Sequence, residues 1–420
     1  MKHFILIGLL LLNFHPIDAQ AADKYVRKGA SGNGTSWSNA YGDLNDVSWT
    51  GMSGYTLWIA AGNYAGTLTT INTPNVTIKR ATVSSHGSSP GWSDSYDGQV
   101  TVDPSAEFLA IDGDADGLII DGVSNNPWKF RVVGVSGWGG MLQNYGADNV
   151  TIRNIEFDGN NENPSQENGP EDGLRFFGGA ANNIIEHCYI HNYAQWETGD
   201  EHMDGVQAPS ATNITFRYNI FANNGMHLFL GDCEWENQYV NGINIHHNLF
   251  YNTANSGYAS YNTIVLKGTN QGGSYPTKIE NNTFAVRSSE FPLPDYRNAI
   301  GLSTECNNMS NSNIRNNIFF KSTPGAVTYF SHSYNAYYGV TAPTETGRIT
   351  GDPLFIDYAN HNYALQSGSP ARDAGTNLGY GEDIIGTAVP QNGSPDMGAY
   401  EFDIGEGRSP ARPTNLRIIK

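Results

Sequence analysis

The chain has 420 residues, a formal net charge of -18, 48 glycines and only 15% charged residues. Binding to phosphate needs a basic surface, so this charge excludes a nucleic-acid partner as a first interpretation. Many glycines with few charges favour short strands and tight turns over helices. A chain of about 400 residues ordinarily suggests two or three domains, but a repeat architecture can form one domain of this length.

The first 21 residues have the features of an export signal. Lys2 and His3 precede an apolar run from Phe4 to Phe14, and Ala19-Gln20-Ala21 provides the small residues of a cleavage site. The apolar run is shorter than the roughly 20 residues that a membrane-spanning helix needs. We therefore expect a mature chain that begins near Ala22 and is secreted, either extracellular or periplasmic.

Short segments with one shared pattern recur between residues 149 and 320. In each, an apolar residue is followed by two variable residues, then usually Asn, one more residue, and Phe or Ile. The leading apolar residues are Ile152, Ile185, Phe216, Ile245, Ile279 and Ile314. Their spacing of 29 to 35 residues indicates a stacked array of repeats. Each repeat contains two or three short alternating runs, which predicts one coil of an all-β, three-sided parallel β-helix.

Asn recurs at one position of this pattern, in Asn219, Asn248, Asn282 and Asn317. We expect a sharp turn there, in which Asn adopts the left-handed backbone conformation and its amide hydrogen-bonds the Asn of the next coil. Cys188 occupies the same position in an earlier coil, so we interpret it as a small interior residue. Together with Cys233 and Cys306 it makes an odd count, which favours buried thiols over a disulfide scaffold.

A second strand precedes the Asn-bearing one in each coil. If Leu174, Val206 and Leu266 point inward, alternation turns Arg175, Gln207 and Lys267 outward on one face. Long loops enter this face, and they carry the aromatic residues Tyr193, Trp196 and Tyr261 among others. Such loops can form the walls of a groove in which aromatic rings contact sugar rings. The alternative is that these aromatic residues only pack the loops onto the solenoid.

Polar side chains are densest around Glu201, His202 and Asp204, with Asp172 in the coil before and His227 and Asp232 in the coil after. Asp172 and Asp204 are each followed by Gly at equivalent positions, so we expect their carboxylates to stack one coil apart. Two carboxylates so close either raise the pKa of one of them or hold a cation such as Ca²⁺. The alternative is an Asp-Gly turn selected for its backbone geometry.

Both ends of the mature chain resemble the ends of secreted bacterial β-helix proteins. The opening segment runs from Tyr25 to Tyr41, and the closing segment (residues 351–402) contains Gly351-Asp-Pro-Leu-Phe355, Ser369-Pro-Ala-Arg-Asp-Ala-Gly375 and Asp396-Met-Gly-Ala-Tyr-Glu-Phe402. The chain thus resembles the pectate-lyase-like superfamily. The resemblance implies a right-handed β-helix domain over residues 22–405 with capped ends, between a signal peptide (1–21) and a tail (406–420).

We therefore expect a secreted enzyme that cleaves a uronic-acid polysaccharide by β-elimination. The catalytic candidates are Lys267, Arg175, His202 and Asp204. The substrate-binding candidates are Gln207, His227, Trp196, Tyr193 and Tyr261. The candidates for binding Ca²⁺ as a cofactor are Glu201, Asp172 and Asp232. The expected partner is the polysaccharide, bound by a monomer that contacts neither nucleic acid nor membrane.

Other activities remain open at this point, because the Arg-x-Pro-x-x-Arg motif of pectate lyases is absent. A glycoside hydrolase would use paired carboxylates such as Asp172, Asp204 and Asp232. The acidic composition favours a neutral substrate and hence the hydrolase, whereas the expected cationic column of Arg175 and Lys267 favours the lyase. An epimerase, or a non-catalytic carbohydrate-binding β-helix, would fit the same scaffold, because a fold does not determine function.

Overall fold

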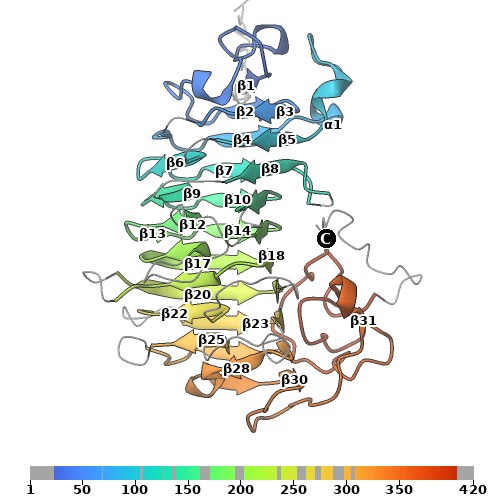
Figure 1. The fold of residues 1–420 in the computed structure, drawn as a ribbon. Helices are drawn as coiled ribbons and strands as arrows, with labels where there is room; N and C mark the ends of the chain where they lie inside the picture. Colours follow the sequence, from blue (N-terminus) through green and yellow to red (C-terminus); the bar gives the residue numbers. More distant parts are fainter. Residues whose placement is uncertain are drawn as a thin grey trace, which may run out of the picture.

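The computed structural model describes residues 23–68, 70–104, 107–125, 127–134, 139–160, 171–193, 203–233, 238–252, 262–269, 276–286, 298–303 and 308–403. These residues form a parallel β-helix, in which three parallel sheets run along one axis (Figure 1). The predicted fold class is therefore confirmed. Within the described ranges, no helix has the length and hydrophobicity of a membrane span.

Sheet A has 12 described strands. They are β1 (Asp23–Val26), β2 (Thr56–Ile59), β4 (Thr77–Arg80), β7 (Ile119–Asp121), β10 (Thr151–Arg153), β13 (Ala180–Ala181), β14 (Ile184–Glu186), β17 (Ala211–Arg217), β20 (Val240–His246), β23 (Thr277–Glu280), β26 (Asn313–Arg315) and β29 (Ser331–Ser333).

Sheet B has 10 described strands. They are β3 (Gly62–Tyr64), β5 (Val100–Val102), β8 (Phe130–Val133), β11 (Glu156–Asp158), β15 (Tyr189–His191), β18 (Ile220–Ala222), β21 (Leu249–Tyr251), β24 (Thr283–Ala285), β27 (Ile318–Phe320) and β30 (Ala336–Tyr338).

Sheet C has eight described strands. They are β6 (Leu109–Asp112), β9 (Gly139–Tyr145), β12 (Glu171–Phe176), β16 (Asp204–Ala208), β19 (Met226–Leu230), β22 (Ile264–Leu266), β25 (Asn298–Leu302) and β28 (Thr323–Gly325). The remaining elements are short: α1 (Val83–His86), η1 (Trp37–Asn39), η2 (Leu44–Asp46), η3 (Asp94–Tyr96), η4 (Ala326–Tyr329), η5 (Tyr358–Asn360), and the antiparallel pair β31 (Phe355–Asp357) and β32 (Asn362–Leu365).

The repeated apolar residues form the interior, as the pattern predicts. The leading apolar residues pair with one another across sheet A, for example Ile245 with Ile279, and both are fully buried. The Phe positions pair across sheet B, and the rings of Phe250 and Phe284 stack 5.0 Å apart at 6°. Because identical side chains lie one above another, each coil offers its neighbour the same surface to pack against.

The repeated Asn residues form a buried ladder between sheets A and B. The side-chain amide of Asn248 donates to Oδ1 of Asn282 at 3.0 Å, and Asn219 donates to Asn248 in the same way. The predicted stacking is confirmed, but the expected backbone conformation belongs to the preceding residue. His247 and Asn281 adopt positive φ angles of 51°, and the ladder residues do not.

The ends of the solenoid are covered by residues that flank its first and last strands. At the beginning, Tyr41 and Leu44 pack against the first coils, and at the end Val327 of η4 joins the same core. The carboxylate of Glu345 accepts from the backbone N–H of Asn335 at 2.7 Å and so ends the Asn ladder. We expected the closing segment to cap the solenoid, but Figure 1 shows it along the side, next to the later strands of sheet B.

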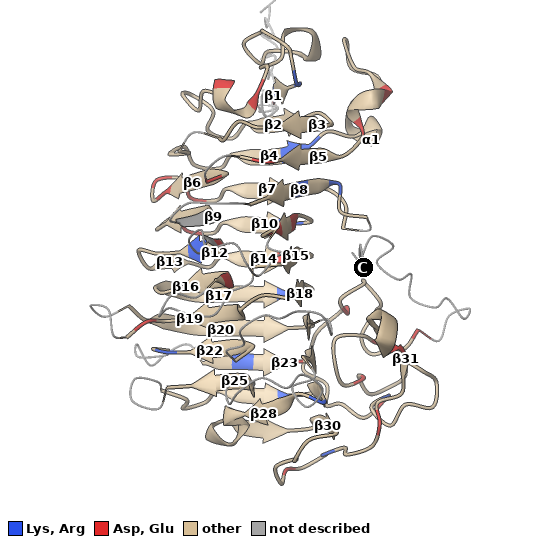
Figure 2. Ribbon diagram, in the orientation of Figure 1, with Lys and Arg blue, Asp and Glu red and all other residues tan. Residues whose placement is uncertain are grey.

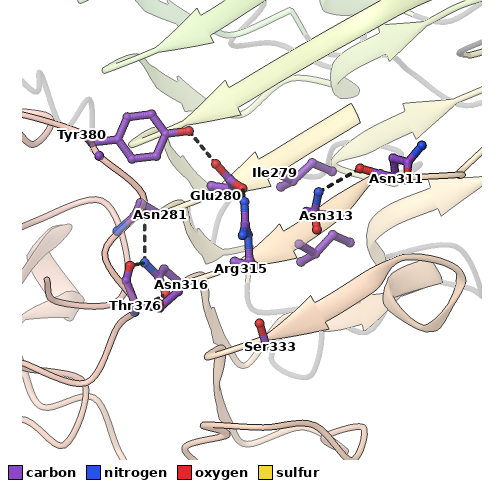
Figure 3. Close-up of polar contacts among 12 residues, drawn as sticks. Ile279, Glu280, Asn281, Asn311, Asn313, Arg315, Asn316, Ser333, Thr376 and Tyr380 are labelled. Carbon is purple, nitrogen blue, oxygen red and sulfur yellow. Dashed lines mark hydrogen bonds and ion pairs between the residues drawn. The ribbon is translucent and has the colours of Figure 1, made fainter. Parts of the chain in front are cut away.

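The closing segment binds an apolar stripe on the outer face of sheet B. Leu249 and Tyr251 of β21 lie in one buried cluster with Tyr363, Leu365 and Met397. Beside this cluster, polar contacts attach the segment to sheet A (Figure 3). There the hydroxyl of Tyr380 donates to Glu280 at 2.6 Å, Arg315 of β26 also contacts Glu280, and Asn316 donates to the carbonyl of Thr376 at 2.8 Å.

Three buried carboxylates of the closing segment accept hydrogen bonds from its backbone. Asp383 accepts from the N–H of Glu401 at 2.8 Å, Glu401 accepts from the N–H of Asp396 at 2.9 Å, and Asp396 accepts from Phe402 and Asp373, both at 2.6 Å. Burial raises the pKa of Asp383 to about 6 and that of Asp396 to about 7. These side chains therefore hold the turns of a segment that has little regular structure.

The cysteines differ from one another in state. Cys188 is a buried free thiol in line with the Asn ladder, and its backbone N–H donates to Oδ1 of Asn219 at 2.9 Å, as expected for an interior residue. Cys233 is disulfide-bonded, which corrects the expectation of a buried thiol at that position. Cys306 lies outside the described residues.

Candidate functional site

The predicted site requires certain residues to lie in register on the outer face of sheet C. Only some of these residues do so. Arg175 pairs with Gln207 in the next strand, and Gln207 pairs with Phe229. Leu230 pairs with Leu266, so Lys267 is in register with Phe177 and not with Arg175. The expectation of one cationic column containing Arg175 and Lys267 is therefore wrong, because the two residues differ by two positions along the strand.

Arg175 is the centre of a polar group on this face. Its Nε lies 3.0 Å from Oε1 of Gln207, to which it donates, and 3.3 Å from Oδ2 of Asp172. Its guanidinium lies over the ring of Phe177, with 4.7 Å from the carbon of the guanidinium to the ring centroid. The side chain is 25% exposed. Two hydrogen-bonding partners and an aromatic ring thus fix an arginine whose charge still reaches the surface.

Asp172 and Asp204 stack one coil apart, as predicted. Oδ1 of Asp172 accepts from the backbone N–H of Asp204 at 2.9 Å, and both residues are buried. The glycines that follow them also stack: a Cβ on Gly173 would lie 2.5 Å from the carbonyl oxygen of Gly205. The close approach of the two strands therefore requires glycine at these positions. A turn is not the reason, since neither glycine has a positive φ.

Three residues of the earlier coils extend this group, and the sequence analysis missed them. Gln143 pairs with Arg175 in the register, and its side chain hydrogen-bonds the carboxylate of Glu107. Burial raises the pKa of Glu107. The ring of Tyr145 stacks on Phe177 at 5.8 Å, and the residue is 48% exposed. Gln143 could have been found by counting back one repeat length from Arg175; no signal in the sequence indicated Glu107.

Tyr145 lies between opposite charges. Burial raises the pKa of its hydroxyl, the negative charge of Glu107 raises this pKa further, and the positive charge of Arg175 lowers it. The group of Glu107, Gln143, Tyr145, Asp172 and Arg175 therefore combines one cation, two carboxyl groups and an exposed aromatic ring. This combination suits a sugar that carries a carboxylate.

Lys267 forms a separate group at the other end of the face. Its Nζ lies 3.3 Å from Oδ1 of Asp232 and 5.9 Å from the ring centroid of Phe229. Asp232 follows β19 and is six residues further along than Met226, which pairs with Asp204. The residues from Met226 to Leu230, the end of β19, alone span about 13 Å. Asp232 therefore cannot join Asp172 and Asp204 around one metal ion, contrary to the predicted ligand set.

Two predicted substrate-binding residues lie in the interior. His227 is 1% exposed, its ring contacts Phe221 and Phe250, and Asn224 donates to its Nδ1 at 3.0 Å. Burial lowers the pKa of His227 to about 3. Tyr193 is also 1% exposed. Neither side chain lies at the surface of the face, which corrects their assignment to substrate binding.

A local irregularity explains the position of His227. The backbone N–H groups of His227 and Leu228 both donate to the carbonyl of Thr263, at 3.0 and 3.1 Å. Two residues opposite one are the arrangement of a β-bulge, which breaks the inward and outward alternation. The remaining predicted site residues are Trp196, Glu201, His202 and Tyr261, and these four lie outside the described residues.

Other polar groups of the described chain are less suited to a ligand. On sheet B, oxygen atoms of Glu156 and Asp158 and a ring nitrogen of His191 lie close enough to share a metal ion, but Arg131 already contacts both carboxylates. A pocket of about 360 Å³ between sheet A and the closing segment is lined by Asp121, Arg153 and Glu186, among others. Arg153 pairs with Asp121 at 3.0 Å and with Glu186 at 3.7 Å. In both places one arginine contacts two carboxylates, whereas Arg175 contacts one.

Comparisons with known proteins support the fold. No protein-family model and no curated protein sequence matches the chain. Among solved structures, it is similar to pectate lyase Pel9A, with a TM-score of 0.52 and 13% identity over 91% of this chain and 98% of that one. Two alginate lyases are more distant. The one from Paenibacillus sp. str. FPU-7 has a TM-score of 0.38 at 11% identity, over 73% of this chain and 95% of that one.

The second alginate lyase, AlyGC of the PL6 family, has a TM-score of 0.31 at 14% identity, over 75% of this chain and 53% of that one. Identities this low indicate shared architecture and leave the chemistry to be argued from the site. The chain therefore has the right-handed parallel β-helix fold that is also found in a pectate lyase.

Proposed function

We propose that this protein is a secreted polysaccharide lyase that cleaves a uronic-acid polymer by β-elimination on the outer face of sheet C. The observation that carries the proposal is the position of Arg175, which Asp172 and Gln207 hold at the surface beside Tyr145 and Phe177. The fold of the chain, which it shares with a pectate lyase, supports the same class of reaction.

In this proposal Arg175 binds the carboxylate of a uronate. Abstraction of the proton on the adjacent carbon transfers negative charge to that carboxylate, and a fixed guanidinium stabilises the charge as it develops. The C–O bond to the neighbouring sugar then breaks, a carbon–carbon double bond forms, and the leaving oxygen takes a proton from water. His202 is the proposed base, since it precedes Asp204 by two residues. Lys267 is too far from Arg175 to act on the same sugar.

Calcium remains a candidate cofactor in this proposal. Asp172 and Asp204 would hold it, together with Glu201, because two buried carboxyl groups in neighbouring strands favour a cation between them. Bound calcium would add positive charge next to the uronate carboxylate. Asp172 also contacts Arg175, so a chelator should change the position of Arg175 as well as remove the ion.

Export fits this function, because a polymeric polysaccharide is degraded outside the cell. The first 21 residues carry the pattern of a signal peptide. Disulfides persist mainly in oxidising compartments, so the disulfide-bonded Cys233 favours the same localisation. We propose an extracellular or periplasmic monomer whose partner is the polysaccharide.

A glycoside hydrolase is the second candidate, and Glu107 favours it. Burial raises the pKa of Glu107, as expected for a general acid, while Asp172 pairs with Arg175. The two residues occupy one column of sheet C two strands apart. Two strand spacings are about 10 Å, close to the carboxyl separation of inverting hydrolases. In that mechanism Glu107 would protonate the leaving oxygen and Asp172 would activate water.

The test is an assay of the mature protein on pectate, alginate, glucuronan and neutral glycans, with and without a chelator. A lyase produces ultraviolet-absorbing unsaturated ends, whereas a hydrolase produces reducing ends without this absorbance. We expect Arg175→Ala to lower the rate at least 100-fold, as expected when a charge-stabilising donor is lost. The matched control is Arg217→Ala, an arginine on sheet A that pairs with Glu186.

The control should retain the wild-type rate, and both variants should still fold, since each loses one ion pair with a largely buried carboxylate. Reducing ends without absorbance would replace the lyase by the hydrolase and direct attention to Glu107. Full activity of Arg175→Ala would remove this residue from the mechanism. Absence of turnover on every substrate would favour a non-catalytic carbohydrate-binding protein.

A further inference from the structure

The two cations on the outer face of sheet C have the same local arrangement. Among the described residues of the sheet C strands and those directly following them, Arg175 and Lys267 are the two with positive side chains. Each lies 3.3 Å from an aspartate oxygen and over an aromatic ring. Each is 25% exposed. The similarity suggests two sites for the same kind of charge.

The distance between these two sites exceeds the size of one sugar ring. Arg175 is on β12, and Lys267 directly follows β22, three strands further along the solenoid. Three strand spacings and two residues along the strand place their Cα atoms about 16 Å apart. A sugar bound at Arg175 therefore cannot reach Lys267, whereas a chain of several sugars can contact both.

The backbone around Lys267 is constrained on several sides. The carbonyl oxygen of Lys267 accepts from the N–H of Cys233 at 2.9 Å, and Cys233 is disulfide-bonded. The chain turns at Gly231, whose φ is +80°, and a Cβ there would lie 2.2 Å from the carbonyl oxygen of Gly268. This close approach brings Asp232 beside Lys267. The ammonium group is therefore held in place, as a binding subsite requires.

Because the protein has a negative net charge, an acidic substrate needs local cations such as these two in order to bind. The formal net charge is -18, so an anionic polymer is repelled at long range. Figure 2 shows Lys and Arg scattered along the described strands of the solenoid. Attraction must then come from individual cations that meet individual carboxylates.

We propose that Lys267 forms a second subsite for a uronate carboxylate, several sugars away from the one at Arg175, so that the protein prefers long anionic chains. This inference rests on the proposed function, and it assigns Lys267 to binding and not to proton abstraction. Phe229 and Asp232 position the ammonium group of Lys267. The ammonium nitrogen lies over the ring of Phe229, which is 4% exposed. A disaccharide at Arg175 leaves this second subsite empty.

The experiment compares Lys267→Met with the wild type on oligogalacturonates and oligomannuronates of two and eight sugars. We expect the KM for the eight-sugar chain to rise about tenfold with kcat unchanged, since only a remote binding interaction is lost. The KM for the two-sugar chain should not change. The control is Lys278→Met, which removes an exposed lysine from β23 of sheet A and should have no effect.

Direct titration of binding separates this inference from the proposed function. If the protein binds the eight-sugar chain but does not cleave it, the lyase proposal fails, and weaker binding by Lys267→Met still supports the second subsite. An equal loss of binding at both chain lengths would overturn the inference, as would unchanged binding at both. A loss of kcat at both lengths, with KM unchanged, would return Lys267 to the catalytic centre.

Discussion

The interior of the solenoid and the outer face of sheet C differ in how residue type varies from coil to coil. In the interior, one position of each coil is Asn from Asn219 to Asn335, and another is aromatic from Phe221 to Tyr337. On the outer face of sheet C, the residues that share the position of Arg175 change in every coil. They are Ala110, Gln143, Gln207, Phe229, Val265 and Gly301.

The difference follows from what each position contacts. An interior side chain contacts the equivalent side chain above and below it, so one residue type that stacks well on itself is selected in every coil. An outer side chain contacts solvent or a ligand, and stacking imposes no single residue type there. Where residues on a regular surface differ from coil to coil and still form specific contacts, as Arg175 does with Asp172 and Gln207, the fold does not explain them.

The largest expected effect is the loss of an interior ladder residue. In Asn248→Ala, the backbone N–H of Asn219 loses its acceptor, and the carbonyl of Phe216 loses a donor. Each buried polar group left without a partner costs about 1–3 kcal/mol, so the unfolding free energy should fall by about 3 kcal/mol or more. Denaturant titration measures this change.

The control for the ladder is Asn313→Ala, which removes an amide outside the ladder that donates to the carbonyl of Asn311 (Figure 3). Its unfolding free energy should change by less than about 1 kcal/mol. Equal losses in the two variants would contradict the idea that the interior ladder, and not asparagine in general, stabilises the fold.

The same difference determines what the sequence could predict. The interior repeats every 29 to 35 residues, so its register, its Asn stacking and its Phe stack could be derived from spacing alone. The left-handed backbone conformation was assigned one position too late in the sequence, because Asn248 and its neighbour His247 are both compatible with a turn. The closing segment was placed at the end of the solenoid, because its sequence does not reveal the apolar stripe on sheet B that it covers.

The outer face could be predicted only where alternation holds. Arg175 and Gln207 were assigned to one column correctly, since the strands around them are regular. Lys267 was assigned to the same column because it also directly follows an apolar residue, Leu266, and the shift of two residues is visible only in the pairing. His227 follows the same pattern, but a bulge at Thr263 turns it inward.

The closing segment is a third case, in which buried carboxylates are neither repeated nor exposed. Burial raises the pKa of Asp396 from 3.8 to about 7. Between pH 4 and 7 the folded protein therefore binds more protons at this residue than the unfolded chain, so its contribution to stability is lost as pH rises. The unfolding free energy at pH 8 should be lower than at pH 5 by about 2 kcal/mol from this source.

Asp396→Asn tests this effect, because asparagine carries no charge at either pH. The difference in unfolding free energy between pH 5 and pH 8 should be about 2 kcal/mol smaller than in the wild type. Asp114→Asn, at an exposed turn, should leave the difference as it is. If Asp396→Asn retained the wild-type pH dependence, the carboxylate would be ionised throughout and the segment would be held by charge instead.

Removing an amide from the outer face should have the smallest effect on stability. It gives the most direct contrast with the ladder. Gln207→Ala removes the hydrogen bond that Arg175 donates at 3.0 Å, but Arg175 keeps Asp172 and solvent as partners. The unfolding free energy should therefore change by less than about 1 kcal/mol. The KM for the substrate should rise a few-fold, because the guanidinium is less well oriented.

The control for this change is Asn244→Ala, which removes an amide from the outer face of sheet A, where Asn244 pairs with Lys278 in the register. It should cost as little stability and leave KM unchanged. A loss in Gln207→Ala as large as in Asn248→Ala would mean that the outer face of sheet C is part of the folding core. A small loss of stability with a raised KM would instead mean that the coil-to-coil variation on this face is selected by a ligand, because nothing in the stacking of the coils requires Gln at that position.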